Sequence, residues 1–407
     1  MFLLITVCII LGVCLGVVTG LIPGIHPNTV FVLLLSALPL LAALPVQCVM
    51  VFVVSLAITN TFTDFIPSLI IGAPDPSTAL SVMPGHMMLL AGRGYEALLL
   101  TAIGGLSVTV VTLLAIPFLL VLIPALYGII HGYLHILLLI ITVPILLSER
   151  GKDRLYALAF FLFAGLLGTV TLNSSSSGQV LFPALSGLFG MSAMFMSFMC
   201  NTRIPSQEIP SKVRCNYARG TAASWFSALL VGLLPGVGSS HAGIISSHLF
   251  RNDVKENLMA LGGINTANMF FTLIVLYAIG KTRSGTSWMI SQIADVAYAD
   301  IILICLTCLV SSCLAVIAVL LLGKTLMKRA HTIPYRRLLL LAMSFITAMA
   351  FLLGGLFGLL VLFTCSFTGI SCSLLGIKKT HLMGFLIMPT ILYFSGMNIY
   401  LLEMMGM

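Results

Sequence analysis

Charged side chains are the scarcest feature of this sequence. Only 7% of the 407 residues are charged and 60% are hydrophobic, which gives a mean hydropathy of +1.18. Soluble domains carry roughly a quarter charged residues, so this composition excludes a soluble globular protein. Apolar runs of about 20 residues, long enough to cross a bilayer, recur from one end of the chain to the other. The sequence therefore predicts a multi-pass protein of the plasma membrane, surrounded by membrane lipid.

Other absences exclude classes of function. The serine run at 174–177 has no Gly-x-Ser-x-Gly setting, and the cysteines and histidines show no convincing metal-ligand spacing. A basic and aromatic module of the kind that binds nucleic acid is also missing. We therefore expect no enzyme activity, no resident cofactor or metal, and no nucleic-acid partner. The first apolar run, 1–19, lacks the basic region and cleavage site of a signal peptide, so we interpret it as a retained span.

The few charges that are present indicate the topology. The formal net charge of +8 comes mainly from clusters beside the apolar runs, at 149–154, 203–219 and 323–337. The positive-inside rule places these loops in the cytoplasm. Together with the apolar runs, they predict an all-α integral membrane protein with about ten to twelve transmembrane helices.

Two interrupted apolar runs indicate an internal duplication. The motif GLIPGIHPN at 20–28 is repeated as GLLPGVGSS at 232–240, and a second match follows downstream, where Asn60 and Gly72 correspond to Asn268 and Gly280. The segment RNDVKE at 251–256 is charged, whereas its counterpart near 39–44 is not, which favours repeats of opposite topology. The predicted organisation is a first membrane repeat at 1–199, a cytoplasmic connector at 200–220 and a second membrane repeat at 221–407.

Proline and glycine at equivalent positions predict broken or re-entrant helices at the repeat interface. Proline ends a helix, and the freed backbone groups are tolerated in a membrane only where protein or a water-filled cavity satisfies them. Helix N-termini that meet there direct their positive dipole ends toward an anion, and hydroxyl groups beside them can donate hydrogen bonds to it. The candidate substrate-binding residues are Pro23, Gly24, Asn28, Gly72, Asp75, Ser77, Thr78, Pro235, Gly236, Ser239, Ser240, Lys281, Arg283, Ser284 and Thr286.

The charged members of this set have two interpretations. Lys281 and Arg283 can bind an anionic substrate while Asp75 carries a proton or holds a cationic group, or the three form a structural salt bridge between loops. An ionised group inside a membrane costs about 3 kcal/mol or more unless it is paired or wet.

A second set of polar residues is a candidate for the coupling ion, H⁺ or Na⁺. Asp64 follows Asn60 by one helical turn inside a largely apolar stretch, either as the coupling-ion group or as a helix-terminal residue near the membrane interface. The candidate ion-coupling residues are Asn60, Thr61, Asp64 and Asn268, while His26, His86 and His241 lie at or near the breaks as candidate proton carriers or as ordinary polar loop residues.

Four motifs in order resemble a known family. These are the two Gly-Pro loops, GAPDPSTALSVMPGHMMLLAGRGYEALLLTAIGG from Gly72, and AGLLGTVTLNSSSSGQVLFP from Ala164. Nearly the whole chain is similar to the large membrane subunit of tripartite tricarboxylate transporters. The resemblance implies a secondary transporter with inverted repeats that moves small carboxylates with proton or sodium coupling. In bacteria such a subunit often works with a small membrane subunit and a substrate-capturing protein. The chain departs from the family pattern at both central breaks, which read APDP and KTRSG.

The sequence therefore predicts a secondary active transporter that moves a small organic anion by alternating access. A homodimer is the favoured assembly, and the need for accessory subunits is left open. The alternative is a translocator of polyprenyl phosphate or another lipid phosphate, because an arginine beside a lipid-facing groove suits a phosphate headgroup.

Overall fold

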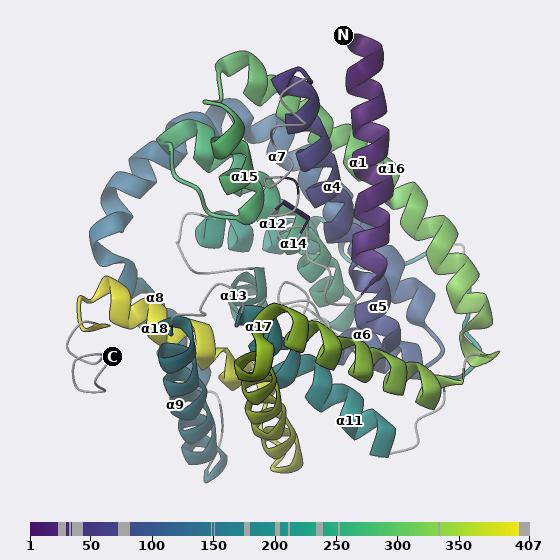
Figure 1. The fold of residues 1–407 in the computed structure, drawn as a ribbon, viewed down its shortest axis with the longest axis vertical. Helices are drawn as coiled ribbons and strands as arrows, with labels where there is room; N and C mark the ends of the chain where they lie inside the picture. Colours follow the sequence, from purple (N-terminus) through teal and green to yellow (C-terminus); the bar gives the residue numbers. More distant parts are fainter. Residues whose placement is uncertain are drawn as a thin grey trace. The chain divides into compact units, whose positions relative to one another are not determined.

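All regular secondary structure in the described part of the chain is helical. The computed structural model describes residues 1–407 except 23–29, 32–33, 35–43, 72–81, 148, 150, 175–179, 200–203, 211, 233–238, 251–252, 333 and 399–407. Within the described residues the secondary structure consists of helices and contains no strand (Figure 1). The predicted all-α class is confirmed.

The chain divides into two compact units, and each of them is built from two separate segments. The first unit contains residues 1–125 and 202–338, and the second contains residues 126–201 and 339–407. Both units thus take one segment from each of the two predicted repeats. The division into repeats at 1–199 and 221–407 remains a prediction.

The helices of the first unit are α1 (Phe2–Leu21), α4 (Val46–Thr63), α5 (Phe65–Ile71), α6 (Val82–Leu90), most of α7 (Gly94–Ile130), α12 (Tyr217–Gly232), α13 (Ser239–Phe250), α14 (Val254–Ile279), α15 (Gly285–Ile293), α16 (Tyr298–Arg329) and the 3-10 turn η4 (Ala330–Thr332). The second unit contains η1 (His131–Tyr133), α8 (Leu134–Leu147), α9 (Asp153–Leu172), α10 (Leu181–Leu185), the π-helical η3 (Ser186–Met191), α11 (Ser192–Met199), most of α17 (Tyr335–Leu374), η5 (Lys379–Met383) and α18 (Gly384–Phe394).

Eight helical stretches among the described residues are long and apolar enough to cross a membrane. They are Phe2–Leu21, Val46–Ile70, Gly94–Ile130, Asp153–Leu172, Leu181–Met199, Val254–Ile279, Tyr298–Thr332 and Tyr335–Leu374. The last of these contains a break at Gly355, whose φ of 58° and ψ of −148° are not helical. The predicted multi-pass character is confirmed, and the shorter helices α8, α12 and α18 also lie in predicted apolar runs.

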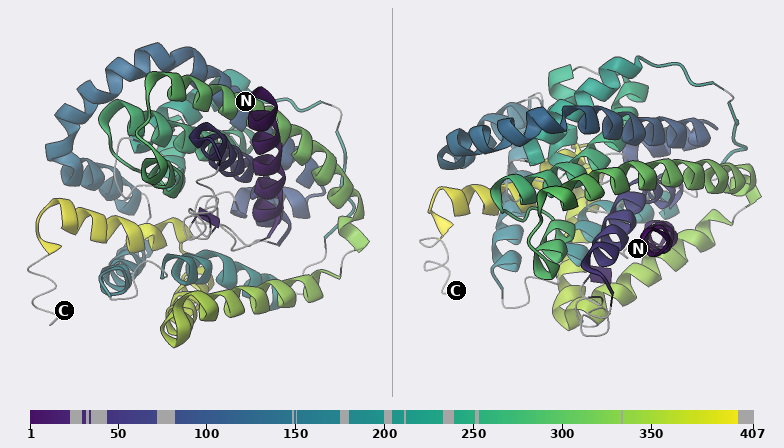
Figure 2. Two further views of the ribbon diagram at one scale, coloured as in Figure 1. Left: turned by 45° about the horizontal axis from the view of Figure 1, so that its top comes forward. Right: turned by 90° about the horizontal axis from the view of Figure 1, so that it is seen from above.

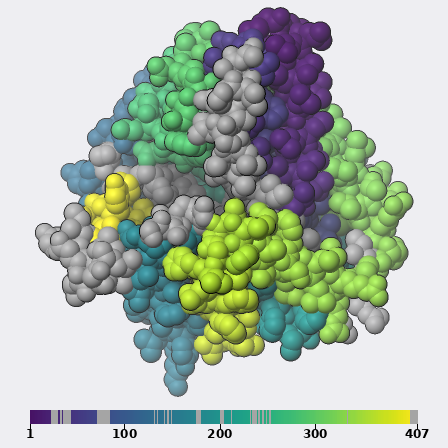
Figure 3. Space-filling model, viewed as in Figure 1, coloured from purple at the N-terminus to yellow at the C-terminus, as the bar shows by residue number. Residues whose placement is uncertain are grey.

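Helix α1 packs against α4 through a stripe of glycines (Figures 1 and 2). A methyl group added to Gly12 would lie 2.6 Å from the carbonyl oxygen of Phe52, and one on Gly16 would lie 2.7 Å from that of Leu56. The opposite face of α1 is exposed and apolar, and forms the purple surface in Figure 3. Because lipid gives apolar helices no hydrophobic reason to associate, this close approach of backbones is what joins the pair.

The same contact recurs in the second half of the sequence. Gly20 of α1 packs against Thr63 of α4, and Gly232 of α12 packs against Phe271 of α14. Gly20 and Gly232 are equivalent in the repeated motif, and Thr63 and Phe271 each lie three residues after the matched asparagines. The two matched glycines therefore lie in corresponding contacts of the helix pairs α1–α4 and α12–α14.

In the first unit, a long helix from each half of the sequence also packs across a helix from the other half. Helix α7 contacts α14 where a methyl group on Gly104 would lie 3.0 Å from the backbone nitrogen of Gly263. Helix α16 contacts α4, where the hydroxyl of Ser311 donates to that of Ser55 at 2.9 Å. Gly263 and Ser55 each lie five residues before a matched asparagine. Each half thus supplies a long helix that packs on the central helix of the other half.

In the second unit, α9 packs against α18 through glycines from both helices. A methyl group on Gly168 would overlap the carbonyl of Phe385, and one on Gly384 would overlap that of Phe161. This backbone contact places η5, directly before α18, against α9.

A buried polar cluster lies beside η5. Glu149 accepts hydrogen bonds from Lys378 at 2.9 Å and from the fully buried His381 at 3.1 Å. The hydrogen bond from Lys378 holds the pKa of Glu149 below its ordinary value. Burial lowers the pKa of His381, and the hydrogen bond to Glu149 only partly opposes this. Burial also lowers the pKa of Lys379 to about 8, and its ammonium donates to Ser192 at 2.8 Å.

The crossing of α7 and α14 yields a stability prediction. We expect Gly262→Ala to lower the melting temperature of the detergent-purified protein by several degrees, because its methyl group would overlap the Thr101 carbonyl and such overpacking costs about 1–3 kcal/mol. Gly128→Ala is the matched control, since nothing lies within 4 Å of the added carbon. Alanine is favoured over glycine in a helix by about 1 kcal/mol, so the control should be neutral or stabilising. Equal melting temperatures for the two variants would contradict this packing.

The polar cluster of the second unit yields a pH prediction. Folding keeps His381 neutral below its ordinary pKa of 6.5, so the unfolded state binds more protons there and stability falls as the pH drops through that value. Glu149 adds a further loss below its ordinary pKa of 4.5. We expect thermal unfolding between about pH 7 and about pH 5.5 to depend less on pH in His381→Gln than in the parent. The exposed His331→Gln should keep the parental slope, and an unchanged slope in both variants would contradict the assignment.

Candidate functional site

Many of the sequence-predicted site residues lie outside the described residues. They are Pro23, Gly24, His26, Asn28, Gly72, Asp75, Ser77, Thr78, Pro235 and Gly236. The remaining candidates belong to the first unit, where they gather around α4, α14 and α15.

The predicted ion-coupling residues of α4 lie in a buried polar junction between α4 and α14. Asp64, 4% exposed, is the residue at which α4 ends and is followed at once by α5. Its carboxylate accepts a hydrogen bond from the side chain of Asn265 at 3.0 Å. The Thr61 hydroxyl lies 3.1 Å from that of Thr266, and Asn60 donates to Thr19 of α1 at 3.2 Å. Three helices therefore contribute polar groups to one apolar interior.

The asparagine that reaches Asp64 is Asn265, which sequence reasoning missed. The Asn265 amide nitrogen donates both to Asp64 Oδ2 and, at 3.3 Å, to the Thr61 carbonyl. The predicted Asn268 lies on the same helix and is partly buried. Aligning the two halves selects Asn268 because it matches Asn60, but the hydrogen bonds from α14 to α4 are made by Asn265 and Thr266. The sequence signal that could have identified Asn265 is its position next to Thr266 and shortly after Gly262 and Gly263 in α14.

The second predicted break is present between α14 and α15. Helix α14 ends at Gly280, whose φ of 65° is left-handed and suits a residue without a Cβ atom. Helix α15 then begins with Ser284 as N-cap, and Ser284 and Ser287 form a reciprocal capping box. The Ser284 hydroxyl also lies 2.9 Å from the Thr272 hydroxyl of α14. The start of α15 is therefore held against α14, and α15 packs against α4 as well.

Basic and hydroxyl groups stand at the N-terminus of α15. The Nε and Nη2 atoms of Arg283 are buried, whereas Lys281 is exposed. Thr286 is fully buried, and its hydroxyl has no hydrogen-bond partner within the described part of the chain. A helix N-terminus, a guanidinium and a hydroxyl together form a group that suits an anion.

The other predicted residues are placed as follows. Ser239 is the buried first residue of α13, so a helix begins directly after the GLLPG break. Ser240 and His241 follow it in α13, and their side chains lie outside the described residues. His86 lies in α6, where its Nδ1 atom is 3.1 Å from the Leu69 carbonyl oxygen and its ring stacks on Tyr335.

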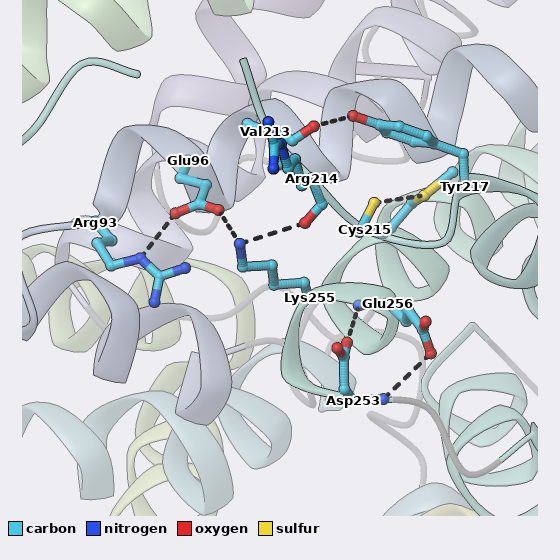
Figure 4. A network of polar contacts seen from close by, with 10 residues as sticks. Arg93, Glu96, Val213, Arg214, Cys215, Tyr217, Asp253, Lys255 and Glu256 are labelled. Carbon is cyan, nitrogen blue, oxygen red and sulfur yellow. Dashed lines mark hydrogen bonds and ion pairs between the residues drawn. The ribbon is translucent and has the colours of Figure 1, made fainter. Parts of the chain in front are cut away.

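Ion pairs hold the first turns of α7 and α14 together (Figure 4). Glu96 lies 2.7 Å from both Arg93 and Lys255, and Lys255 also donates to the Arg214 carbonyl at 3.3 Å. The hydrogen bond to Glu96 raises the pKa of Arg93. Helix α14 begins with a capping box in which Asp253 and Glu256 bond each other's backbone. The GRGYEAL motif therefore joins the two halves at one end of the unit.

The connector after residue 203 is bound to the same end. Gln207 accepts from the Gly94 backbone at 2.8 Å and donates to the Leu89 carbonyl at 2.9 Å. The Glu208 backbone donates to the Gly92 carbonyl at 2.8 Å. The described connector thus forms part of the first unit and clamps the turn between α6 and α7.

The geometry gives the first unit two polar sites on one helix. Asn265 and Thr272 are seven residues apart on α14, which places them on nearly the same face and about 10 Å apart. One site is a buried carboxylate and amide, and the other is a helix N-terminus with basic and hydroxyl groups. Among the described residues, no group of three or more His, Cys, Asp or Glu side chains is placed to hold a metal ion.

Comparisons with known proteins agree with this architecture. The family model described as "Tripartite tricarboxylate transporter TctA family" matches residues 6–384. An uncharacterized protein of Methanocaldococcus jannaschii is 28% identical over 399 residues, which cover 95% of this chain and 98% of that relative. No solved structure gives a significant match. The chain therefore belongs to the TctA family of tripartite tricarboxylate transporters, which makes it a multi-pass membrane component of a transport system and not a member of an enzyme family.

Proposed function

We propose that this protein is a secondary active transporter that carries a small organic anion, of the di- or tricarboxylate type, across the plasma membrane by alternating access coupled to H⁺ or Na⁺. Family membership supports the transport role. The anionic substrate and the mechanism rest on the residues of the first unit.

The observation that carries the proposal is the buried N-terminal end of α15. Arg283 directly precedes the N-cap Ser284, and two of its guanidinium nitrogens are buried. A guanidinium keeps its positive charge and presents its N–H donors in a fixed fork. The positive end of the helix dipole adds to the same field, and the buried Thr286 hydroxyl can donate a hydrogen bond. Carboxylates match this combination in charge and in geometry, because a guanidinium binds them through two parallel hydrogen bonds.

The reciprocal packing of the two halves supports inverted repeats and alternating access. Helix α7 of the first half packs on α14, and α16 of the second half packs on α4. In transporters built from such repeats, substrate and ion sites lie where interrupted helices of the two halves meet. Asp64 and Asn265 come from different halves of the sequence and bond each other where α4 contacts α14. Rocking one half against the other would open this region to either side in turn.

The tripartite family also supports a partner requirement. The large subunit of a tripartite system normally works with other subunits. We propose that this chain supplies the membrane pathway of such an assembly. Translocation of lipid phosphates, the alternative predicted from the sequence, is not favoured by the family.

A ligand screen tests the anion site. We expect di- and tricarboxylates to raise the melting temperature of the purified protein, and soluble prenyl-phosphate analogues not to, because a ligand that binds only the folded state stabilises it. Arg283→Ala should weaken carboxylate binding by at least about tenfold, as expected for the loss of roughly 1.4 kcal/mol or more of binding energy, so about ten times as much ligand should be needed for the same rise in melting temperature. The matched control is Arg337→Ala, an exposed arginine of the same unit.

Two results would contradict the proposal. A carboxylate response that Arg283→Ala leaves unchanged would remove this arginine from the substrate site. A response to the prenyl phosphates alone would indicate that the protein translocates lipid phosphates instead.

A further inference from the structure

The last turn of α4 brings together oxygen atoms of the kind that bind a small hard cation. The helix continues from α4 into α5 at Asp64, whose carboxylate is almost completely buried. Pro67 follows in α5 and has no N–H group to offer the Thr63 carbonyl, which lies one turn before it. In transporters, backbone carbonyls at irregular points of a helix coordinate coupling ions.

One atom marks the point where these oxygens converge. The Asn265 amide nitrogen donates to Asp64 Oδ2 at 3.0 Å and to the Thr61 carbonyl oxygen at 3.3 Å. The side-chain oxygen and the backbone oxygen therefore approach the same small volume from one turn of α4. If the Asn265 side-chain amide rotates by about 180°, its oxygen takes the place of its nitrogen, and a third oxygen then faces the same volume. Three oxygens, one of them charged, suit a cation such as Na⁺.

The surrounding polar groups hold these oxygens in place. The Ser68 hydroxyl donates to the Asp64 carbonyl at 2.7 Å, and the Thr63 hydroxyl donates to the Gly16 carbonyl of α1 at 3.2 Å. The hydroxyls of Thr61 and Thr266 bond each other, which fixes α14 against α4 beside Asn265. Because their hydrogen bonds are made within the protein, these groups position the site.

We propose that Asp64, the Thr61 carbonyl and Asn265 form the binding site for the coupling ion, and that this ion is Na⁺. The inference deepens the proposed transport function and rests on it for the coupling role. The involvement of a backbone carbonyl favours a metal cation over a proton, because a proton needs only the carboxylate. The site joins α4 of one half to α14 of the other, so an ion bound there changes the contact between the halves. Thr272, two turns along the same face of α14, connects it to the substrate site at α15.

The binding experiment uses Na⁺ alone and needs no substrate. We expect NaCl to raise the melting temperature of the full-length protein by a few degrees above the value in an equal concentration of KCl. Asp64→Asn should abolish this difference, and Asn265→Ala, which keeps the carboxylate, should reduce it by at least half. The controls are Asp295→Asn, an exposed aspartate between α15 and α16, and Asn268→Ala, the neighbouring asparagine of α14. Both should respond to Na⁺ as the parent does.

The transport experiment tests the coupling role in proteoliposomes. With an inward Na⁺ gradient, Asp64→Asn should reduce the concentrative uptake of carboxylate at least about tenfold relative to the parent. Exchange of labelled for unlabelled substrate at equal concentrations, which needs no gradient, should be retained.

Each outcome separates the two proposals. A Na⁺ effect that is absent from the parent, or unchanged in Asp64→Asn, overturns the ion site whatever the protein transports. An uptake that depends on pH and not on Na⁺ overturns it in favour of a proton. A Na⁺ effect that Asp64→Asn abolishes, in a parent that moves no carboxylate, supports the ion site and overturns the proposed function instead.

Discussion

Direct contact between helix backbones is the constraint on which the first unit depends. In a membrane, burying apolar side chains against other helices gains little over burying them in lipid, so helices join where small residues allow close van der Waals contact. Gly16 provides this on α1 and Gly262 on α14, in each case against a backbone carbonyl of the neighbouring helix. The positions of these glycines also set how α4 is turned toward α1 and how α14 is turned toward α7, and the polar side chains of α4 and α14 meet within that packing.

The interruptions of the helices follow a second constraint. A backbone group inside a membrane must be satisfied by protein or by water, so a helix end within the protein needs specific partners. At the start of α15 the partners are the side chains of Ser284 and Ser287, and at the end of α4 they include the amide of Asn265. Such partners are the polar groups that an ion or an anionic substrate also recognises. The structural requirement and the proposed binding chemistry are thus met by the same residues.

The sequence predicted the class of the fold and the break between α14 and α15 well, because both depend on local composition. Hydropathy located the spans, and Gly280 and Ser284 located this break, while Asp64 was predicted only to lie in a largely apolar stretch. Asn265 was missed, because the choice between it and Asn268 depends on how α14 is turned toward α4. The division into two units could not be read from the sequence either. It depends on which long helices pack together, and the repeats alone suggest a division at the middle of the chain.

The interleaving of the two segments in the first unit has a consequence for biosynthesis. Asp64 and Asn265 are 201 positions apart in the chain. At synthesis rates of about 5–20 residues per second, the aspartate enters the membrane about 10–40 s before its partner is made. During that interval the first half holds the Asp64 carboxylate and the backbone at Gly104 without the α14 residues that contact them. The nascent chain is therefore a substrate for the cell's membrane insertion and quality-control machinery until α14 arrives, and truncation before that helix would leave a polar span for proteolysis.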